Sequence, residues 1–176
     1  MVRSALEIAT TWHGDPLEPA EQAVVRVVLE DGAIAVTVAA PFVADPAPLV
    51  ARGRTERLWE HEVVEVFFAE SATRGSRYLE LELGPHGHWL AFGFASYRAL
   101  TVSDIAVTFE ASIVGTRWAG QAHIAAPEVA RAVAAIGAMN AYAIRGVGAA
   151  RRYMAAWPAP NGAYPGPDFH RTEYFK

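Results

Sequence analysis

The sequence predicts an all-β protein, an antiparallel β-sandwich of the immunoglobulin or jelly-roll kind with one short helix. Three observations predict this fold class. Short runs of β-branched and aromatic residues recur about every ten residues and are separated by glycine, proline and aspartate. The pair Asp31-Gly32 lies between two valine-rich runs, as in a two-residue hairpin. One segment, 127–136, has the pattern of a helix.

The predicted strands follow one another along the whole chain. In order they are residues 4–12, 22–30, 33–40, 62–69, 77–84, 88–95, 104–114, 116–124, 138–147, 151–157 and 169–175. Asp31-Gly32 predicts a hairpin because both residues tolerate the positive φ of a type I′ turn, and 84–87 predicts a second hairpin. The helix is bounded by Pro127, which suits its first turn, and by Gly137, which suits the position after its end.

Composition limits the class of protein. The chain has 176 residues, no cysteine, 15 Lys+Arg and 19 Asp+Glu, and a formal charge of -4. We expect a single domain over 1–176 that folds without disulfides. The mild acidity and the absence of long charged or apolar runs favour neither nucleic acid nor membrane as a partner. The N-terminal residues lack the apolar core of a signal peptide, so we expect a cytoplasmic location. The sequence does not indicate an oligomeric state.

Alternation in two of the strands predicts which side chains are buried. In 77–83, Leu79, Leu81 and Leu83 share one face, because side chains in a strand alternate with a period of two. The leucines are predicted to be core, and Glu80 and Glu82 on the other face are predicted to face water.

The segment 59–68 contains a first candidate binding site. Its core face is Val64, Val66 and Phe68, and its other face places Glu65 between apolar residues. If the segment is extended, Trp59 lies on that same face. An indole offers a flat surface to the C–H groups of a sugar, and a carboxylate accepts hydrogen bonds from its hydroxyls. The alternative is that Trp59 closes the core and Glu65 pairs with an arginine.

Several motifs, in this order, resemble family 9 carbohydrate-binding modules and the wider DOMON-like superfamily. The segment 59–68 resembles the family's Trp-x-x-Asp-x-Val-Glu motif, with Glu62 in place of Asp. Segments resembling its later strands follow at 78–87, 140–145 and 153–158, and 167–170 resembles its closing Pro-x-x-Phe-Gly segment, with His170 in place of Gly. The resemblance covers roughly 20–176.

The resemblance implies a β-sandwich that holds a terminal sugar between two tryptophans. Carried over to this sequence, the two tryptophans are Trp59 and Trp157, and the carboxylate is Glu65. Further candidates to bind the ligand are Asn140, Arg145 and Arg98. Members of the family can also hold calcium, but no acidic loop of the usual kind is present, so we expect no cofactor and no metal, with calcium left possible. We also expect a bacterial protein.

We therefore expect a non-catalytic domain that binds a carbohydrate or a similar small molecule. One alternative is a glycan hydrolase that uses Glu80, Glu82 or Glu65, because two carboxyl groups on one strand face have a spacing suited to glycoside hydrolysis. Another is a protein-interaction module that has lost sugar binding. His86 and His88 have a spacing that allows two imidazoles to share a metal, but a third ligand is not evident nearby.

Overall fold

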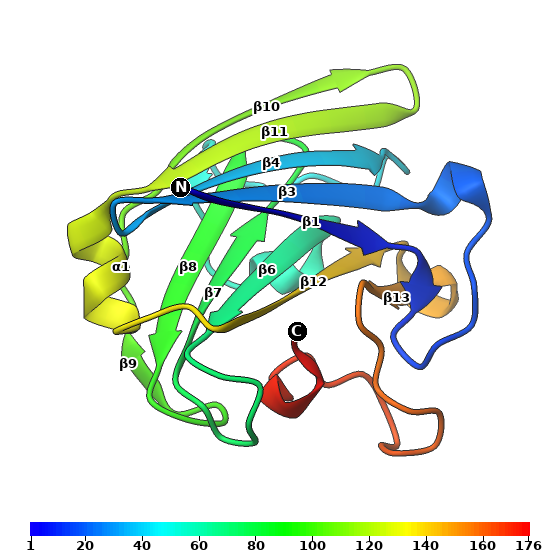
Figure 1. The fold of residues 1–176 in the computed structure, drawn as a ribbon. Helices are drawn as coiled ribbons and strands as arrows, with labels where there is room; N and C mark the ends of the chain where they lie inside the picture. The colour runs from blue at the N-terminus through cyan, green and yellow to red at the C-terminus, as the bar shows by residue number, and fades with distance from the viewer.

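The computed structural model describes residues 1–176 as two β-sheets packed face to face (Figure 1). The first sheet has the order β1-β3-β4-β11-β10, and all its pairs are antiparallel. Its strands are β1 (Val2–Ile8), β3 (Ala23–Glu30), β4 (Ala33–Pro41), β10 (Thr108–Val114) and β11 (Arg117–Ile124).

The second sheet carries the features on which function depends. Its order is β2-β13-β12-β6-β7-β8-β5, with β9 paired to β8. The strands are β2 (Thr10–Thr11), β5 (Gly53–Arg54), β6 (Val63–Ala69), β7 (Tyr78–Leu83), β8 (His88–Phe94), β9 (Leu100–Val102), β12 (Ala138–Arg145) and β13 (Arg152–Ala155). Only the short β5–β8 pair is parallel. A single α-helix, α1 (Ala126–Ala132), lies at one end of the two sheets (Figure 1). The predicted all-β sandwich with one short helix is confirmed.

Both predicted hairpins form, and their turn residues adopt the backbone that the prediction requires. Asp31 and Gly32 join β3 to β4 with φ values of 50° and 80°. This pair of positive angles belongs to a type I′ turn, which matches the twist of the flanking strands. The turn 84–87 joins β7 to β8, and Gly87 has a φ of 85°.

The space between the sheets is filled by the predicted core face of each central strand. Leu79, Leu81 and Leu83 are fully buried there, together with Val66 and Phe68 of the neighbouring strand β6. This main cluster also takes in the valines and isoleucines of the first sheet. The period-two interpretation of these strands was therefore correct for their inner faces.

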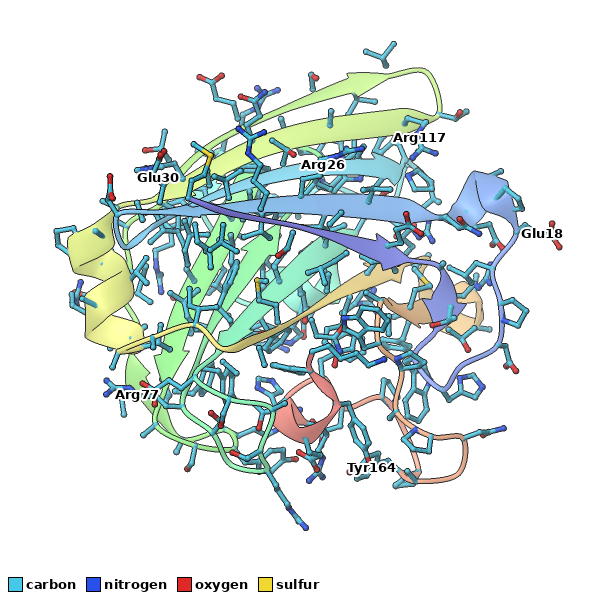
Figure 2. All side chains as sticks on the ribbon, in the orientation of Figure 1. Glu18, Arg26, Glu30, Arg77, Arg117 and Tyr164 are labelled. Atoms are coloured by element: carbon cyan, nitrogen blue, oxygen red, sulfur yellow. The ribbon has the colours of Figure 1, made fainter.

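The two sheets differ on their outer faces. On the first sheet this face meets solvent: Arg26 is exposed, and Figure 2 shows it with Glu30 and Arg117 on that side of the molecule. The outer face of the second sheet is covered by the C-terminal segment, which carries Tyr164 and lies on the opposite side in Figure 2. This covered face holds a second apolar cluster.

The C-terminal segment is held against the second sheet by rings and by backbone hydrogen bonds. The ring of Phe169 stacks on that of Tyr142 with centroids 4.0 Å apart. Lys176 and Met139 exchange two backbone hydrogen bonds of 2.7 and 3.0 Å. The strand predicted over 169–175 is wrong, since this segment is irregular and ends in a 3-10 turn at Thr172–Tyr174.

Other boundaries also differ from the prediction. The helix ends at Ala132 rather than at 136, because Val133 is already extended, with φ -138° and ψ 145°. The first predicted strand is divided into β1 and β2, and β10 begins four residues later than predicted, at Thr108. None of the helices has the length and hydrophobicity that a membrane crossing needs.

Candidate functional site

Three glutamates lie together on the outer face of the second sheet. Glu65 on β6 is directly opposite Glu82 on β7, and Glu80 is opposite Phe67, one diagonal step away from Glu65. Side chains in these relations are close enough to interact. All three are buried, at 3%, 5% and 0% exposure for Glu65, Glu80 and Glu82.

The prediction that Glu80 and Glu82 face water is therefore wrong. Alternation placed them correctly on the face opposite the leucines, but that face is covered in the folded protein. The second apolar cluster lies there and combines rings of the sheet itself, such as Tyr78 and Phe94, with Phe169 of the C-terminal segment. Because these rings replace water over the sheet, the glutamates lie in an apolar layer.

A cavity of about 420 Å³ opens on this face, a volume within the usual range for small-ligand sites. Much of its lining is aromatic and comes from four parts of the chain: Trp59, Phe92, Phe94, Tyr153 and Phe169. Its polar residues are Glu65, Glu80, Arg98 and His170. Trp59 and Leu100 are 40% and 50% exposed, so they mark the mouth of the cavity.

The residues around Trp59 are not extended, contrary to the prediction. Arg57 has a left-handed backbone with φ 59°, and a 3-10 turn follows at Leu58–Glu60. Leu58 is fully buried and anchors the turn, whereas the indole of Trp59 reaches the cavity. The guanidinium of Arg151 fixes the turn by donating to the carbonyl oxygens of Trp59 and Glu60.

Burial makes the carboxyl groups weak acids. Loss of solvation, followed by repulsion from Glu80, raises the pKa of Glu65 well above its usual value. Burial likewise raises the pKa of Glu80 to about 8, against the charge of Arg98. The charged form of a carboxyl group is disfavoured in an apolar layer. In both groups burial therefore favours the protonated form over the ionised form.

Glu82 lies directly across from Glu65. Both of its side-chain oxygens are buried without a hydrogen-bond partner. Burial is the main cause that raises the pKa of Glu82, and the charges of Glu65 and Glu80 add to it. The backbone N–H of Trp59 is near enough to oppose this shift slightly but makes no hydrogen bond of acceptable geometry.

A charged network lies at one side of the cavity. Asp168 Oδ2 accepts a hydrogen bond from Tyr97 Oη at 2.8 Å and lies 2.7 Å from Arg171 Nε, and Asp168 Oδ1 accepts a hydrogen bond from Arg98 Nη2 at 3.2 Å. Burial alone would raise the pKa of Asp168, but the hydrogen bond from Tyr97 and the two arginine charges outweigh burial and lower it. Asp168 is thus ionised, and it already neutralises part of the arginine charge.

His170 is a neutral member of the cavity wall. Burial, with the nearby charge of Arg98, lowers the pKa of His170 to about 3. Its Nδ1 lies 2.7 Å from the hydroxyl of Tyr78, which already accepts the backbone N–H of Arg98 at 3.2 Å. The tautomer of His170 decides which of these two groups is the donor.

Of the predicted site residues, Trp59, Glu65 and Arg98 line the cavity, whereas Trp157, Asn140 and Arg145 do not. Arg145 is buried at the end of β12, where its Nη2 donates to the carbonyl oxygen of Glu21 at 2.7 Å. The predicted pair of tryptophans does not line one common cavity. Phe92, Phe94, Tyr153 and Phe169 supply the other aromatic surfaces.

Trp157 and Asn140 are hydrogen-bonded to each other away from the cavity. The side-chain oxygen of Asn140 accepts the backbone N–H groups of Ala141 and Trp157, and its Nδ2 donates to Trp157 O and to Tyr142 Oη. These bonds fix the chain where it leaves β13. The indole of Trp157 packs against the main core and lies 4.1 Å from Lys176 Nζ.

Sequence reasoning did not include Phe92, Phe94, Tyr153 and Phe169 in the site. A signal for Phe92 and Phe94 was present, since both occupy alternate positions of one strand, but the same pattern describes a buried face. No group of three or more His, Asp or Glu side chains is arranged to hold a metal ion. His88, considered for a metal together with His86, instead has Nε2 3.2 Å from Val50 O.

Fold and cavity define a class of protein: an antiparallel β-sandwich with a ligand-sized, partly aromatic site on the outer face of one sheet. The chain belongs to the UPF0462 protein family. It is 36% identical over 179 residues to the mouse UPF0462 protein C4orf33 homolog, and the match covers 97% of this chain and 88% of the mouse protein. The human and zebrafish proteins are 34% and 35% identical, and each is covered over 85% of its length. No family model matches the chain.

These relatives are vertebrate, so the expectation of a bacterial protein is contradicted. A solved structure from Bacteroides uniformis, described as a "putative carbohydrate-binding protein", has a similar fold with a TM-score of 0.70. The match covers 99% of this chain and 84% of that protein, at 17% sequence identity. This likeness shows that the chain has the fold of that protein.

Proposed function

We propose that the cavity binds a carbohydrate or a similar small molecule that has both polar and apolar surfaces. The observation that carries the proposal is the cavity itself: about 420 Å³, aromatic over much of its lining, with Glu65 and Glu80 directed into it. Aromatic rings suit the C–H face of a sugar ring, and carboxyl groups without partners suit its hydroxyl groups.

The similar fold of the Bacteroides uniformis protein supports this proposal. As part of the proposal, we assign the sandwich to the DOMON-like superfamily, on its resemblance to family 9 carbohydrate-binding modules. The site differs from the two-tryptophan arrangement that this resemblance implies. Trp59 keeps its role at the mouth, and Phe92, Phe94 and Phe169 act in place of Trp157.

Glycan hydrolysis is the second candidate, and one observation favours it. Two carboxyl groups, Glu65 and Glu80, line one cavity, and burial raises the pKa of each, as the general acid of a glycosidase requires. The reaction also needs an ionised partner as nucleophile or base. Since the same burial disfavours ionisation of both groups, binding without hydrolysis agrees better with the site.

Calorimetric titration with a panel of monosaccharides and disaccharides tests the proposal. We expect at least one sugar to bind the natural protein, and Trp59→Ala to weaken that binding about tenfold, because it removes the ring at the mouth. Trp157→Phe is the matched control, since Trp157 does not line the cavity. This variant is expected to change the affinity for the sugar by no more than about twofold.

A folded protein that binds none of these sugars would refute the proposal for carbohydrates. Incubation with nitrophenyl glycosides separates the second candidate from the first. Release of nitrophenol that disappears in Glu80→Gln would establish hydrolysis, whereas binding without release supports a binding protein.

A further inference from the structure

The glutamates of the cavity have no cationic partner within the protein. Glu65 and Glu80 are 97% and 95% buried and line the cavity, yet neither carboxyl group makes a hydrogen bond or an ion pair. Behind them, both oxygens of Glu82 are also unpaired. A buried polar group without a partner typically costs about 1–3 kcal/mol, so the two oxygens of Glu82 call for an explanation, and the carboxyl groups of Glu65 and Glu80 are free to pair with a ligand in the cavity.

The arginines nearest to this cluster are bound to other groups. Arg98 pairs with Asp168, and Arg151 donates to the carbonyl oxygens of Trp59, Glu60 and Gly146. Both guanidinium groups act on Glu65 only through their charge. The negative charge that the cluster could develop is therefore unmatched by a direct contact.

The residues around the glutamates indicate which kind of cation the cavity can bind. No group of three acidic or histidine side chains is placed to hold a metal ion, which disfavours a bare metal. The cavity instead places aromatic rings, among them Trp59, Phe92 and Tyr153, around the same space as the carboxyl groups. Aromatic faces together with carboxylates are the combination that binds organic ammonium groups.

We propose that the cavity takes a small organic cation, with the protonated amine of the ligand held by Glu65 and Glu80 and its carbon skeleton held by the aromatic lining. An amino sugar is the form that agrees with the proposed carbohydrate function, and the inference rests on that function because it names the ligand of the same cavity. Glu82, across from Glu65, is a third carboxyl group beside the cavity.

Binding of the amine is coupled to release of a proton. Burial favours the protonated carboxyl groups, whereas an ammonium group beside them favours the ionised form, so affinity for an amine rises with pH from 5 to 7. Charged or titratable groups from every neighbouring element act on the cluster. The charged groups are Arg98, Arg151 and Glu56, and the titratable tyrosines beside the cluster are Tyr78 and Tyr142. His170 lines the same cavity, and Asp168 pairs with Arg98 beside it.

Calorimetric titration with matched probes tests the inference. The cationic probes are glucosamine, galactosamine and choline, and the neutral probes are N-acetylglucosamine, N-acetylgalactosamine and glucose. We expect at least one cationic probe to bind about tenfold more tightly than its neutral counterpart. The heat of binding is expected to vary with the ionisation enthalpy of the buffer, since a proton is released.

Glu80→Gln removes the charge but keeps the shape of the side chain. It is expected to weaken binding of the cationic probe about tenfold and binding of a neutral sugar by a clearly smaller factor, because the amide still forms hydrogen bonds with hydroxyl groups. Glu30→Gln is the control, because Glu30 is exposed at the end of β3 in the other sheet. Thermal unfolding of each variant shows whether it is folded.

The outcomes separate this inference from the proposed function. Equal or tighter binding of the neutral sugars, with no effect of Glu80→Gln, overturns the cationic ligand and leaves carbohydrate binding in place. Binding of choline alone supports the cationic ligand and contradicts the sugar. If the folded protein binds no probe of either set, both proposals fail.

Discussion

Replacing Glu80 by glutamine is expected to stabilise the protein at neutral pH. Burial raises the pKa of Glu80 from 4.5 to about 8, so the folded state holds a proton that the unfolded state releases. Between these two values the contribution of Glu80 to stability falls as pH rises, by about 1.4 kcal/mol per pH unit. From pH 4.5 to 7 the contribution of Glu80 to the unfolding free energy falls by about 3 kcal/mol. Glutamine has no proton to retain, so Glu80→Gln avoids this loss.

Urea unfolding followed by tryptophan fluorescence at pH 5, 6 and 7 measures the difference. The natural protein and the variant should have nearly equal unfolding free energies close to pH 4.5. The difference should grow as pH rises, until the variant is more stable by about 3 kcal/mol at pH 7. The control variant Glu30→Gln, at an exposed position, should not diverge from the natural protein in this way. A constant difference between Glu80→Gln and the natural protein over this range would refute the argument that Glu80 carries a buried proton.

Four other variants test three separate parts of the structure. Because the pKa of His170 is lowered to about 3, the folded state excludes a proton that the unfolded state takes up near pH 6.5, and the contribution of His170 to stability is lost as pH falls. His170→Asn should therefore flatten the decline in unfolding free energy between pH 6 and 4. An unchanged slope would contradict the low pKa. Phe68 is fully buried between the sheets, and Phe68→Ala should lower the unfolding free energy in urea by about 3–5 kcal/mol, whereas a loss below about 1 kcal/mol would place it outside the core. Gly146 and Gly162 both have φ near 80°, but only at Gly146 would a Cβ overlap the backbone of Ala150. Thermal unfolding should show Gly146→Ala to be the less stable of the two alanine variants by at least ~2 kcal/mol, and equal losses would argue against the overlap.

The parts of the fold that were predicted correctly depend on local sequence. The alternation of Leu79, Leu81 and Leu83 determines one face of β7 whatever the strand packs against. The positive φ of Asp31 and Gly32 is likewise a property of two adjacent residues. Neither result needed knowledge of distant contacts.

The environment of the glutamates was mispredicted because it depends on distant residues. Alternation shows that Glu80 and Glu82 share a face, but it does not show what covers that face. His170, part of the cover, hydrogen-bonds to Tyr78 from 92 residues away along the chain. The segment that carries it is irregular, so no periodic pattern marks it as part of a layer.

The predictions for the two tryptophans also depended on structure that alternation does not describe. Trp59 was expected to reach the site through an extended strand, yet it lines the cavity from a 3-10 turn that begins after the left-handed Arg57. Trp157 follows β13, but the bonds between its backbone and Asn140 hold it at the edge of the main core. Side-chain parity cannot be extended through residues that leave the strand.

The three glutamates are not required by the fold. Leucines fill the inner positions of the same strand, and apolar residues such as Phe67 and Phe92 occupy neighbouring outer positions. A leucine at Glu82 would remove two unpaired buried oxygens and the repulsion from Glu65. Buried acids that lower stability and line a cavity are typical of functional sites, where the arrangement serves a ligand. The stability cost and the proposed cationic ligand therefore have the same origin, since an ammonium group in the cavity would supply the partner that the carboxyl groups lack.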